Sequence, residues 1–273
     1  MTTTTKPAMA RRLLGRTVST GRLLTAPVRA LPSFVIIGAQ RSGTTTLLSA
    51  ICQHPLVTSA RPTEVHFFDR PSVPSLVLYR QHFPWPRSAI AGESSPYYLA
   101  HPDAAGILCP ALPEAKLIAI LRHPIDRAWS QWRFNVRRGV EPLSFLDAIE
   151  AEEDRLAGVD GGGSRLEPVR WHQEYSYLLR GDYAPQLDRF VAAAGRERLL
   201  ILRSQDLYQE PGPTLRATLA FLGLTPHEVA VGHLNHGGSE QLDSSTRELL
   251  RARTASALEE LADRYGIVLN ELG

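Results

Sequence analysis

Residues 34–38 form a continuous apolar run, FVIIG, that ends directly in a loop bounded by two glycines. An uninterrupted apolar run of this length is typical of a strand buried on both faces, as in a parallel sheet. The loop, Gly38–Gly43, is followed by Thr44–Cys52, whose apolar positions 47, 48 and 51 fit one face of a helix that stops before Pro55. A strand, a phosphate-type loop and a helix in this order indicate an α/β fold.

Later parts of the chain repeat the same alternation. Three more strands are predicted at 89–92, 116–121 and 198–202, each followed by a helical pattern. We therefore expect a three-layer, P-loop-like α/β fold with a central, mostly parallel sheet flanked by helices. Three later helices are predicted: 124–138, 211–222 and a long helix that reaches Tyr265. A capping-box pattern at 245–248 precedes the last of them.

The beginning of the chain differs in charge from the rest. Residues 1–33 carry no acidic side chain and six basic ones: Lys6, Arg11, Arg12, Arg16, Arg22 and Arg29. We expect a basic, disordered leader over 1–33 and one domain over 34–273. Three interpretations of the leader remain open: a transit-type peptide, a polyanion-binding arm or a ragged terminus. The domain itself is net acidic and has no basic stripe interleaved with aromatics, so we expect no nucleic-acid partner.

Cysteine content and hydropathy exclude several other classes of protein. The two cysteines, Cys52 and Cys109, lie in different segments, so neither a disulfide framework nor a cysteine-based metal cluster is predicted. No window approaches the roughly 20 apolar residues that a membrane-spanning helix needs. The sequence favours a reducing compartment and no transmembrane segment, and it leaves the oligomeric state open.

The loop after the first strand has the spacing of a phosphate-binding loop without its lysine. Gly38–Gly43 copies the G-x-x-x-x-G frame, but Thr44 and Thr45 follow where a kinase has Lys and Ser or Thr. Arg41 lies inside the loop. We expect the loop N–H groups, the helix dipole and the hydroxyls of Ser42, Thr44 and Thr45 to hold a phosphate without Mg²⁺, with Arg41 reaching the group linked to it.

A second anion site is predicted at the end of the strand 116–121. Arg122 follows this strand, and α/β sheets bind their ligands at the carboxyl ends of the strands. On the next helix, positions 123, 127 and 130 share a face, so we expect Ser130 to join Arg122 on one anion. Each residue alone is also compatible with a solvated surface position. Together the two sites specify a nucleotide with phosphates at both ends.

Motifs in this order resemble sulfotransferases that use 3′-phosphoadenosine 5′-phosphosulfate (PAPS). Residues 37–45 (IGAQRSGTT) resemble the 5′-phosphosulfate loop of that family, and 121–130 (LRHPIDRAWS) its 3′-phosphate motif. Residues 64–69 (EVHFFD) are similar to the K-E-x-H-F-F-D of heparan-sulfate-type O- and N-sulfotransferases. Residues 92–98 (GESSPYY) and 180–183 (RGDY) extend the resemblance along the chain.

This resemblance implies transfer of a sulfuryl group from PAPS to a hydroxyl, or with less support an amine, of a carbohydrate, lipid or secondary-metabolite acceptor. It implies Glu64 as the general base, since a partly buried Glu can have a raised pKa, Arg41 as the cation on the transferring group, and His66 with Asp69 as residues that orient the acceptor. No metal is implied. The implied PAPS-binding residues are Arg41, Ser42, Gly43, Thr44, Thr45, Arg122 and Ser130.

Some positions depart from the family pattern. Thr63 and Ser94 stand where the heparan enzymes often have lysine, so a polyanionic glycan acceptor is less expected. Secretory relatives carry a membrane anchor that this sequence lacks, which favours a cytoplasmic, bacterial enzyme. Two glycine-rich segments, Gly158–Gly163 and Asn235–Gly238, are candidates for a lid and for a nucleotide contact.

Two other functions share some of these sequence features. A P-loop nucleotide or small-molecule kinase would need the missing lysine after Gly43 and a Mg²⁺-binding carboxylate at a strand end. A nucleotide-binding module without turnover would not need Glu64.

Overall fold

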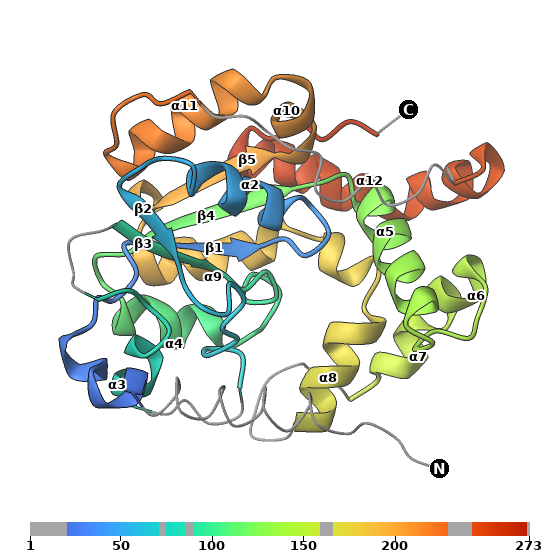
Figure 1. Ribbon diagram of the computed structural model, residues 1–273. Coiled ribbons are helices and arrows are strands. Elements are labelled where there is room, and N and C mark those ends of the chain that lie inside the picture. Colours follow the sequence, from blue (N-terminus) through green and yellow to red (C-terminus); the bar gives the residue numbers. More distant parts are fainter. Residues whose placement is uncertain (1–20, 71–74, 86–89, 159–165, 229–241, 272–273) are drawn as a thin grey trace, which may run out of the picture.

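The structure is a computed structural model, which describes residues 21–70, 75–85, 90–158, 166–228 and 242–271. The described strands form one five-stranded parallel sheet in the order β2-β3-β1-β4-β5 (Figure 1). Their bounds are β1 (Phe34–Gly38), β2 (Val57–Ser59), β3 (Ile90–Ser94), β4 (Lys116–Leu121) and β5 (Leu199–Arg203). The predicted α/β fold class is confirmed.

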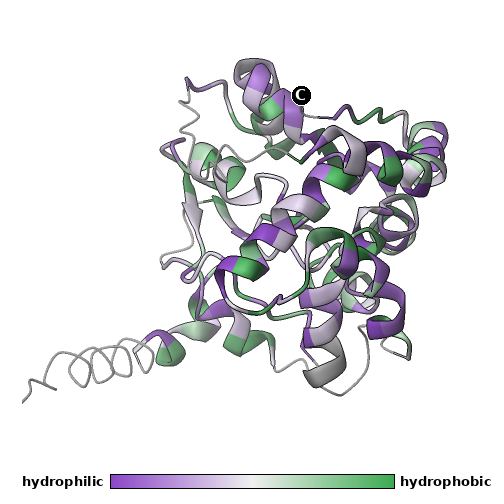
Figure 2. Ribbon diagram, turned by 90° about the vertical axis from the view of Figure 1, so that its right-hand side faces the viewer, coloured by the Kyte–Doolittle hydropathy of each residue, from purple (hydrophilic) through white to green (hydrophobic). Residues whose placement is uncertain are grey.

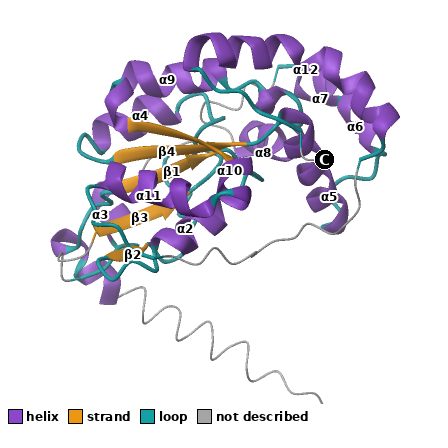
Figure 3. Cartoon of the chain, turned by 90° about the horizontal axis from the view of Figure 1, so that it is seen from above, coloured by secondary structure: helices purple, strands orange, loops and turns teal. Residues whose placement is uncertain are grey.

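Helices cover both faces of the sheet (Figure 3). The α-helices are α2 (Thr44–Ile51), α3 (Leu76–Arg80), α4 (Ala104–Ala111), α5 (Pro124–Arg137), α6 (Phe145–Glu150), α7 (Glu152–Leu156), α8 (Leu166–Tyr175), α9 (Ala184–Ala194), α10 (Ser204–Gln209), α11 (Pro211–Leu222) and α12 (Ser244–Tyr265). Three short 3₁₀ helices are η1 (Ala26–Val28), η2 (Leu179–Gly181) and η3 (Arg196–Arg198).

Alternate residues of β1 divide the core into two layers. Val35 and Ile37 pack with α4 and α9, whereas Phe34 and Ile36 pack with α2 and α11. This alternation explains why every residue of β1 is buried, because each face of the strand meets a helical layer. Along their lengths the helices change between hydrophilic and hydrophobic residues, as expected of helices that meet the sheet on one face and solvent on the other (Figure 2).

Helices α5 to α8 lie beyond the carboxyl ends of the strands, at the right of Figure 1. A separate apolar cluster in this region includes Ile125 of α5, Phe145 of α6, Tyr177 and Leu250 of α12. Because the ends of β1 and β4 point toward this side, the segments that follow these two strands meet there. No helix in the described part of the chain has both the length and the apolar character needed to span a bilayer.

The structure differs from the sequence expectations at several element boundaries. The capping-box prediction at 245–248 is wrong: Asp243 caps α12 by accepting a hydrogen bond from the Thr246 N–H at 2.8 Å, and Ser245 lies inside the first turn. Strand β2 was not predicted, since three residues are too few for a periodic pattern. The proposed lid and Asn235–Gly238 lie outside the described residues, apart from Gly158.

Packing also begins before Phe34. Arg22 donates to the carbonyl of Gln81 at 2.6 Å, and Arg29 donates to the carbonyl of Phe83 at 2.7 Å. These contacts tie residues 21–33 to the segment around α3, so the packed part of the chain starts earlier than the boundary expected from composition.

Candidate functional site

The loop after β1 presents the N-terminus of α2 at the carboxyl edge of the sheet. Gly43 caps this helix with φ 97°, a conformation that favours glycine, and a Cβ there would lie 2.9 Å from the Tyr208 hydroxyl. Ser42 and Thr44 are buried and Thr45 is exposed. The first turn has no acidic side chain, so the helix dipole makes this end a favourable place for an anion.

Arg41 connects this loop to α5. Its Nε donates a hydrogen bond to Ser130 Oγ at 3.2 Å, across 89 positions of sequence, and its guanidinium lies 4.7 Å from the centre of the Phe134 ring. The backbone of Arg41 has φ 70°, a conformation that a non-glycine residue rarely adopts. The two phosphate motifs predicted from sequence are therefore brought together by the side chain predicted to act on the transferred group.

Arg122 approaches the same loop from the end of β4. Its Nη1 donates to the Arg41 carbonyl at 3.4 Å, and its Nε is buried without a hydrogen-bond partner among the described residues. Burial lowers the pKa of Arg122, although Asp126 acts in the opposite direction. A buried N–H group of a cation without a partner favours an anionic ligand, because leaving it unpaired costs free energy.

The segment Thr63–Asp69 carries the three acceptor-side candidates on irregular backbone. His66 Nδ1 lies 2.5 Å from Asp69 Oδ2, and His66 Nε2 lies 3.3 Å from Glu64 Oε2. Burial disfavours the imidazolium, but the hydrogen bonds and charges of Asp69 and Glu64 outweigh it and raise the pKa of His66 to about 10. Glu64 is more exposed than expected, with 46% of its side chain accessible.

A buried carboxylate that the sequence analysis did not single out lies next to this segment. Glu93, at 0% exposure, accepts hydrogen bonds from the hydroxyls of Tyr79 at 2.6 Å and Tyr98 at 3.2 Å through Oε1, and from Ser95 at 2.6 Å through Oε2. Burial raises the pKa of Glu93, and these hydrogen bonds oppose the rise. In the sequence, Glu93 directly follows the predicted strand 89–92, and a charged residue at the end of a buried strand is the signal for such a network.

The network holds the Glu64 segment in place through its backbone. Ser95 Oγ accepts from the N–H groups of Val65 at 3.0 Å and His66 at 2.9 Å. The Tyr98 hydroxyl accepts from the Phe67 N–H at 2.8 Å. The positive φ of His66, 50°, is thus stabilised by hydrogen bonds that the N–H groups of this segment donate to hydroxyls about 30 positions later.

The two halves of the site lie within electrostatic range of each other. Burial, then the charges of Arg137 and Arg122, lower the pKa of Arg41, while the charge of Glu64 raises it. The arrangement therefore pairs a surplus of cations at the helix terminus with an accessible carboxylate. Chemically, it can bind an anion and remove a proton from a neighbouring group.

Comparisons with known proteins agree with this geometry. The family described as "Sulfotransferase domain" matches residues 31–249. The chain is 30% identical over 210 residues to bifunctional heparan sulfate N-deacetylase/N-sulfotransferase 4 of Mus musculus, an alignment that covers 72% of this chain and 23% of that protein. It is 33% identical over 147 residues to the membrane-associated sulfotransferase kil1 of Dictyostelium discoideum, covering 50% of this chain and 31% of that one.

A solved sulfotransferase from Alicyclobacillus acidocaldarius superimposes with a TM-score of 0.72 at 29% sequence identity, covering 88% of this chain and 98% of that one. The present chain spans about a quarter of the length of the mouse relative. The sulfotransferase resemblance seen in the sequence is confirmed, and with it an enzymatic function. The chain belongs to the sulfotransferase domain family, whose sulfuryl donor is PAPS.

Proposed function

We propose that this enzyme transfers the sulfuryl group of PAPS to an acceptor hydroxyl, with Glu64 as the general base. The observation that carries the proposal is the hydrogen bond from Arg41 Nε to Ser130 Oγ at 3.2 Å. It joins the loop suited to a 5′-phosphosulfate to the helix suited to a 3′-phosphate. The fold class alone would not require this contact.

The residues at this edge of the sheet fit a nucleotide with two separate anionic groups. Ser42, Gly43, Thr44 and Thr45 would hold the 5′-phosphate at the N-terminus of α2. Arg122 and Ser130 would hold the 3′-phosphate, and the buried Nε of Arg122 supports this role because it has no partner among the described residues. PAPS supplies the activated sulfuryl group when it is bound.

Each catalytic candidate would have a distinct task. Glu64 accepts the proton of the acceptor hydroxyl, and its accessible side chain leaves room for that acceptor. His66, held by Asp69 on its other nitrogen, donates a hydrogen bond to Glu64 and fixes its direction. Arg41 stabilises negative charge on the departing phosphate; it is a poor proton donor, because guanidinium stays protonated.

The acceptor side favours an uncharged or weakly charged molecule. Thr63 and Ser94 replace lysines that would bind an anionic glycan, and Ser94 is buried. We therefore place the acceptor among hydroxylated carbohydrates, lipids or secondary metabolites. An amine acceptor has less support because Glu64 suits removal of a proton from a neutral hydroxyl.

Ligand-dependent thermal stability tests the donor site first. We expect 3′-phosphoadenosine 5′-phosphate (PAP) to raise the melting temperature, with little effect of AMP, ADP or ATP with Mg²⁺, because a ligand that binds only the folded state stabilises it. A positive result justifies an acceptor screen with labelled PAPS. Stabilisation by ATP with Mg²⁺ alone would contradict the assignment of Arg122 and Ser130 and favour a kinase.

A further inference from the structure

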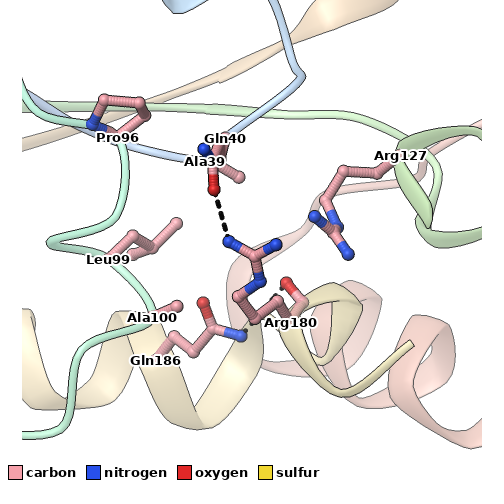
Figure 4. Close-up of a pocket in the computed structure, with 8 residues that line it drawn as sticks. All are labelled: Ala39, Gln40, Pro96, Leu99, Ala100, Arg127, Arg180 and Gln186. Atoms are coloured by element: carbon pink, nitrogen blue, oxygen red, sulfur yellow. Dashed lines mark hydrogen bonds between the residues drawn. The ribbon is translucent and has the colours of Figure 1, made fainter. Parts of the chain in front are cut away.

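Two arginines are almost completely buried behind the phosphate loop. Arg127 on α5 is 1% exposed and Arg180 in η2 is 3% exposed. Both line a small cavity whose other walls include Ala39 and Gln40 of the loop and Leu99 (Figure 4). None of the residues assigned above to PAPS lines this cavity.

The hydrogen bonds of the two side chains account for only part of their N–H groups. Arg127 Nη2 donates to the carbonyl of Tyr177, and Arg180 donates through Nε to the carbonyl of Ser176 at 3.0 Å and through Nη1 to Gln40 Oε1 at 2.5 Å. Arg127 Nε and Nη1 and Arg180 Nη2 are buried without partners among the described residues. Figure 4 shows the two guanidinium groups turned toward each other.

The charges of this pair are incompletely neutralised within the described part of the chain. The carboxylate whose charge acts on both arginines is Glu152, and its oxygens accept hydrogen bonds from the N–H groups of Tyr177, Leu178 and Leu179. Burial, and then the charge of Arg127, lower the pKa of Arg180 to about 9. Two guanidinium groups and one carboxylate leave one positive charge in a region of low dielectric.

We propose that this cavity binds one small monovalent anion, of the chloride class, between the guanidinium groups of Arg127 and Arg180. A single water molecule would satisfy some of the N–H groups but would leave the charge uncompensated. The cavity has about 10 Å³ of free space, about the minimum that one guest of the size of a water molecule needs. The Gln186 amide, whose oxygen would repel an anion, lies on the far side of Arg180 from Arg127 in Figure 4.

Such an anion would stabilise the phosphate loop from behind. Arg180 is held by the anion on one side and holds Gln40, the residue before Arg41, on the other. The anion is therefore a structural ligand, separate from the nucleotide. Its binding does not depend on which donor or acceptor the enzyme uses.

Crystals of the full chain grown with PAP and sodium bromide test the proposal directly. PAP occupies the N-terminus of α2, so halide binding there does not confuse the result. We expect an anomalous bromide peak between the two guanidinium groups. Density for water with no anomalous signal overturns the proposal. If PAP fails to bind, the donor assignment fails, and bromide crystals without PAP still decide the anion site.

Thermal unfolding in solution provides the second measurement. Sodium chloride should raise the melting temperature of the parent protein above that in sodium gluconate of equal ionic strength, by about 5 °C at a hundredfold excess over Kd. Arg180→Gln should lose this difference. Arg155→Gln is the matched control, because Arg155 pairs with Glu141 at 2.7 Å and lies outside the cavity, so it should keep the difference. Equal melting temperatures of the parent in both salts overturn the proposal.

Discussion

The two irregular segments of the site, the phosphate loop Gly38–Gly43 and the Glu64 segment Thr63–Asp69, are held in different ways. The phosphate loop lies between β1 and α2, so its neighbours in sequence direct its backbone. Among the described residues, the Glu64 segment is not directly flanked by a helix or strand, and its N–H groups bond instead to Ser95 and Tyr98. The first loop is flanked directly by regular elements and gains further contacts from Arg122 and Arg180, whereas the second is held mainly by residues about 30 positions away.

Because the two segments are held differently, substitutions in the two halves of the site should affect different properties of the enzyme. Changes to the anion-binding residues should affect nucleotide affinity with little effect on the acceptor side. Changes to the buried anchor around Glu93 should disturb the Glu64 segment and leave nucleotide binding intact. Each of the following substitutions tests whether the two halves are as independent as their anchors indicate.

The largest effect is expected from Glu64→Gln. Loss of the general base should lower kcat by about 10²–10⁴-fold, while PAP affinity and melting temperature stay near those of the parent because the side chain is exposed. Turnover with an acceptor found in the PAPS screen measures the effect. Glu114→Gln, at another exposed position, is the control and should remain fully active. Equal activity of both variants would remove Glu64 as the base.

Arg122→Ala should come next. Loss of a charge-assisted contact to phosphate should weaken PAP binding by about 1.5–3 kcal/mol, or roughly tenfold to 150-fold. Calorimetric titration with PAP measures this change. The exposed Arg216 on α11 offers a control, and Arg216→Ala should bind PAP as the parent does. Unchanged affinity in Arg122→Ala would separate this residue from the nucleotide site.

Ser95→Ala tests the remote anchor of the Glu64 segment. The His66 N–H group loses its acceptor and the Val65 N–H group keeps only Glu93 Oε2 at 3.4 Å, so we expect a loss of about 1–3 kcal/mol in the free energy of unfolding, and a lower kcat at unchanged PAP affinity. Ser94→Ala is the matched control, because the buried Ser94 hydroxyl has no hydrogen-bond partner among the described residues. The anchor hypothesis fails when the two variants behave alike in both stability and turnover.

The smallest effect concerns the pH dependence of His66. Its pKa in the folded protein, about 10, is above the ordinary value of 6.5, so its stabilising contribution is complete below about pH 6.5 and declines as pH rises toward 10. The melting-temperature difference between the parent and His66→Asn should therefore shrink from pH 6 to pH 10. The corresponding change in the free energy of unfolding should not exceed about 1 kcal/mol, since the ion pair is partly exposed. A difference that stays constant with pH would contradict the ion pairs.

Local sequence determined much of the scaffold. The strands β1 and β4 and the starts of α5 and α11 agree with the sequence predictions, because an apolar run and a proline in the first helical turn act within a few residues. The glycine at position 43 likewise reports a local requirement, a positive φ before α2. These features depend on residues that lie only a few positions away in the sequence.

Only the tertiary structure decided which distant side chains meet. The contact of Arg41 with Ser130, the support of His66 by Ser95 and the facing pair Arg127 and Arg180 all join different elements of the fold. The burial of these side chains also depends on the tertiary structure. Helix periodicity placed position 127 on the face of 123 and 130, but it could not show that the Arg127 side chain is buried. Sequence spacing records the direction of a side chain along its own element, whereas hydrogen bonding and dielectric environment depend on what the other layers of the fold place against it.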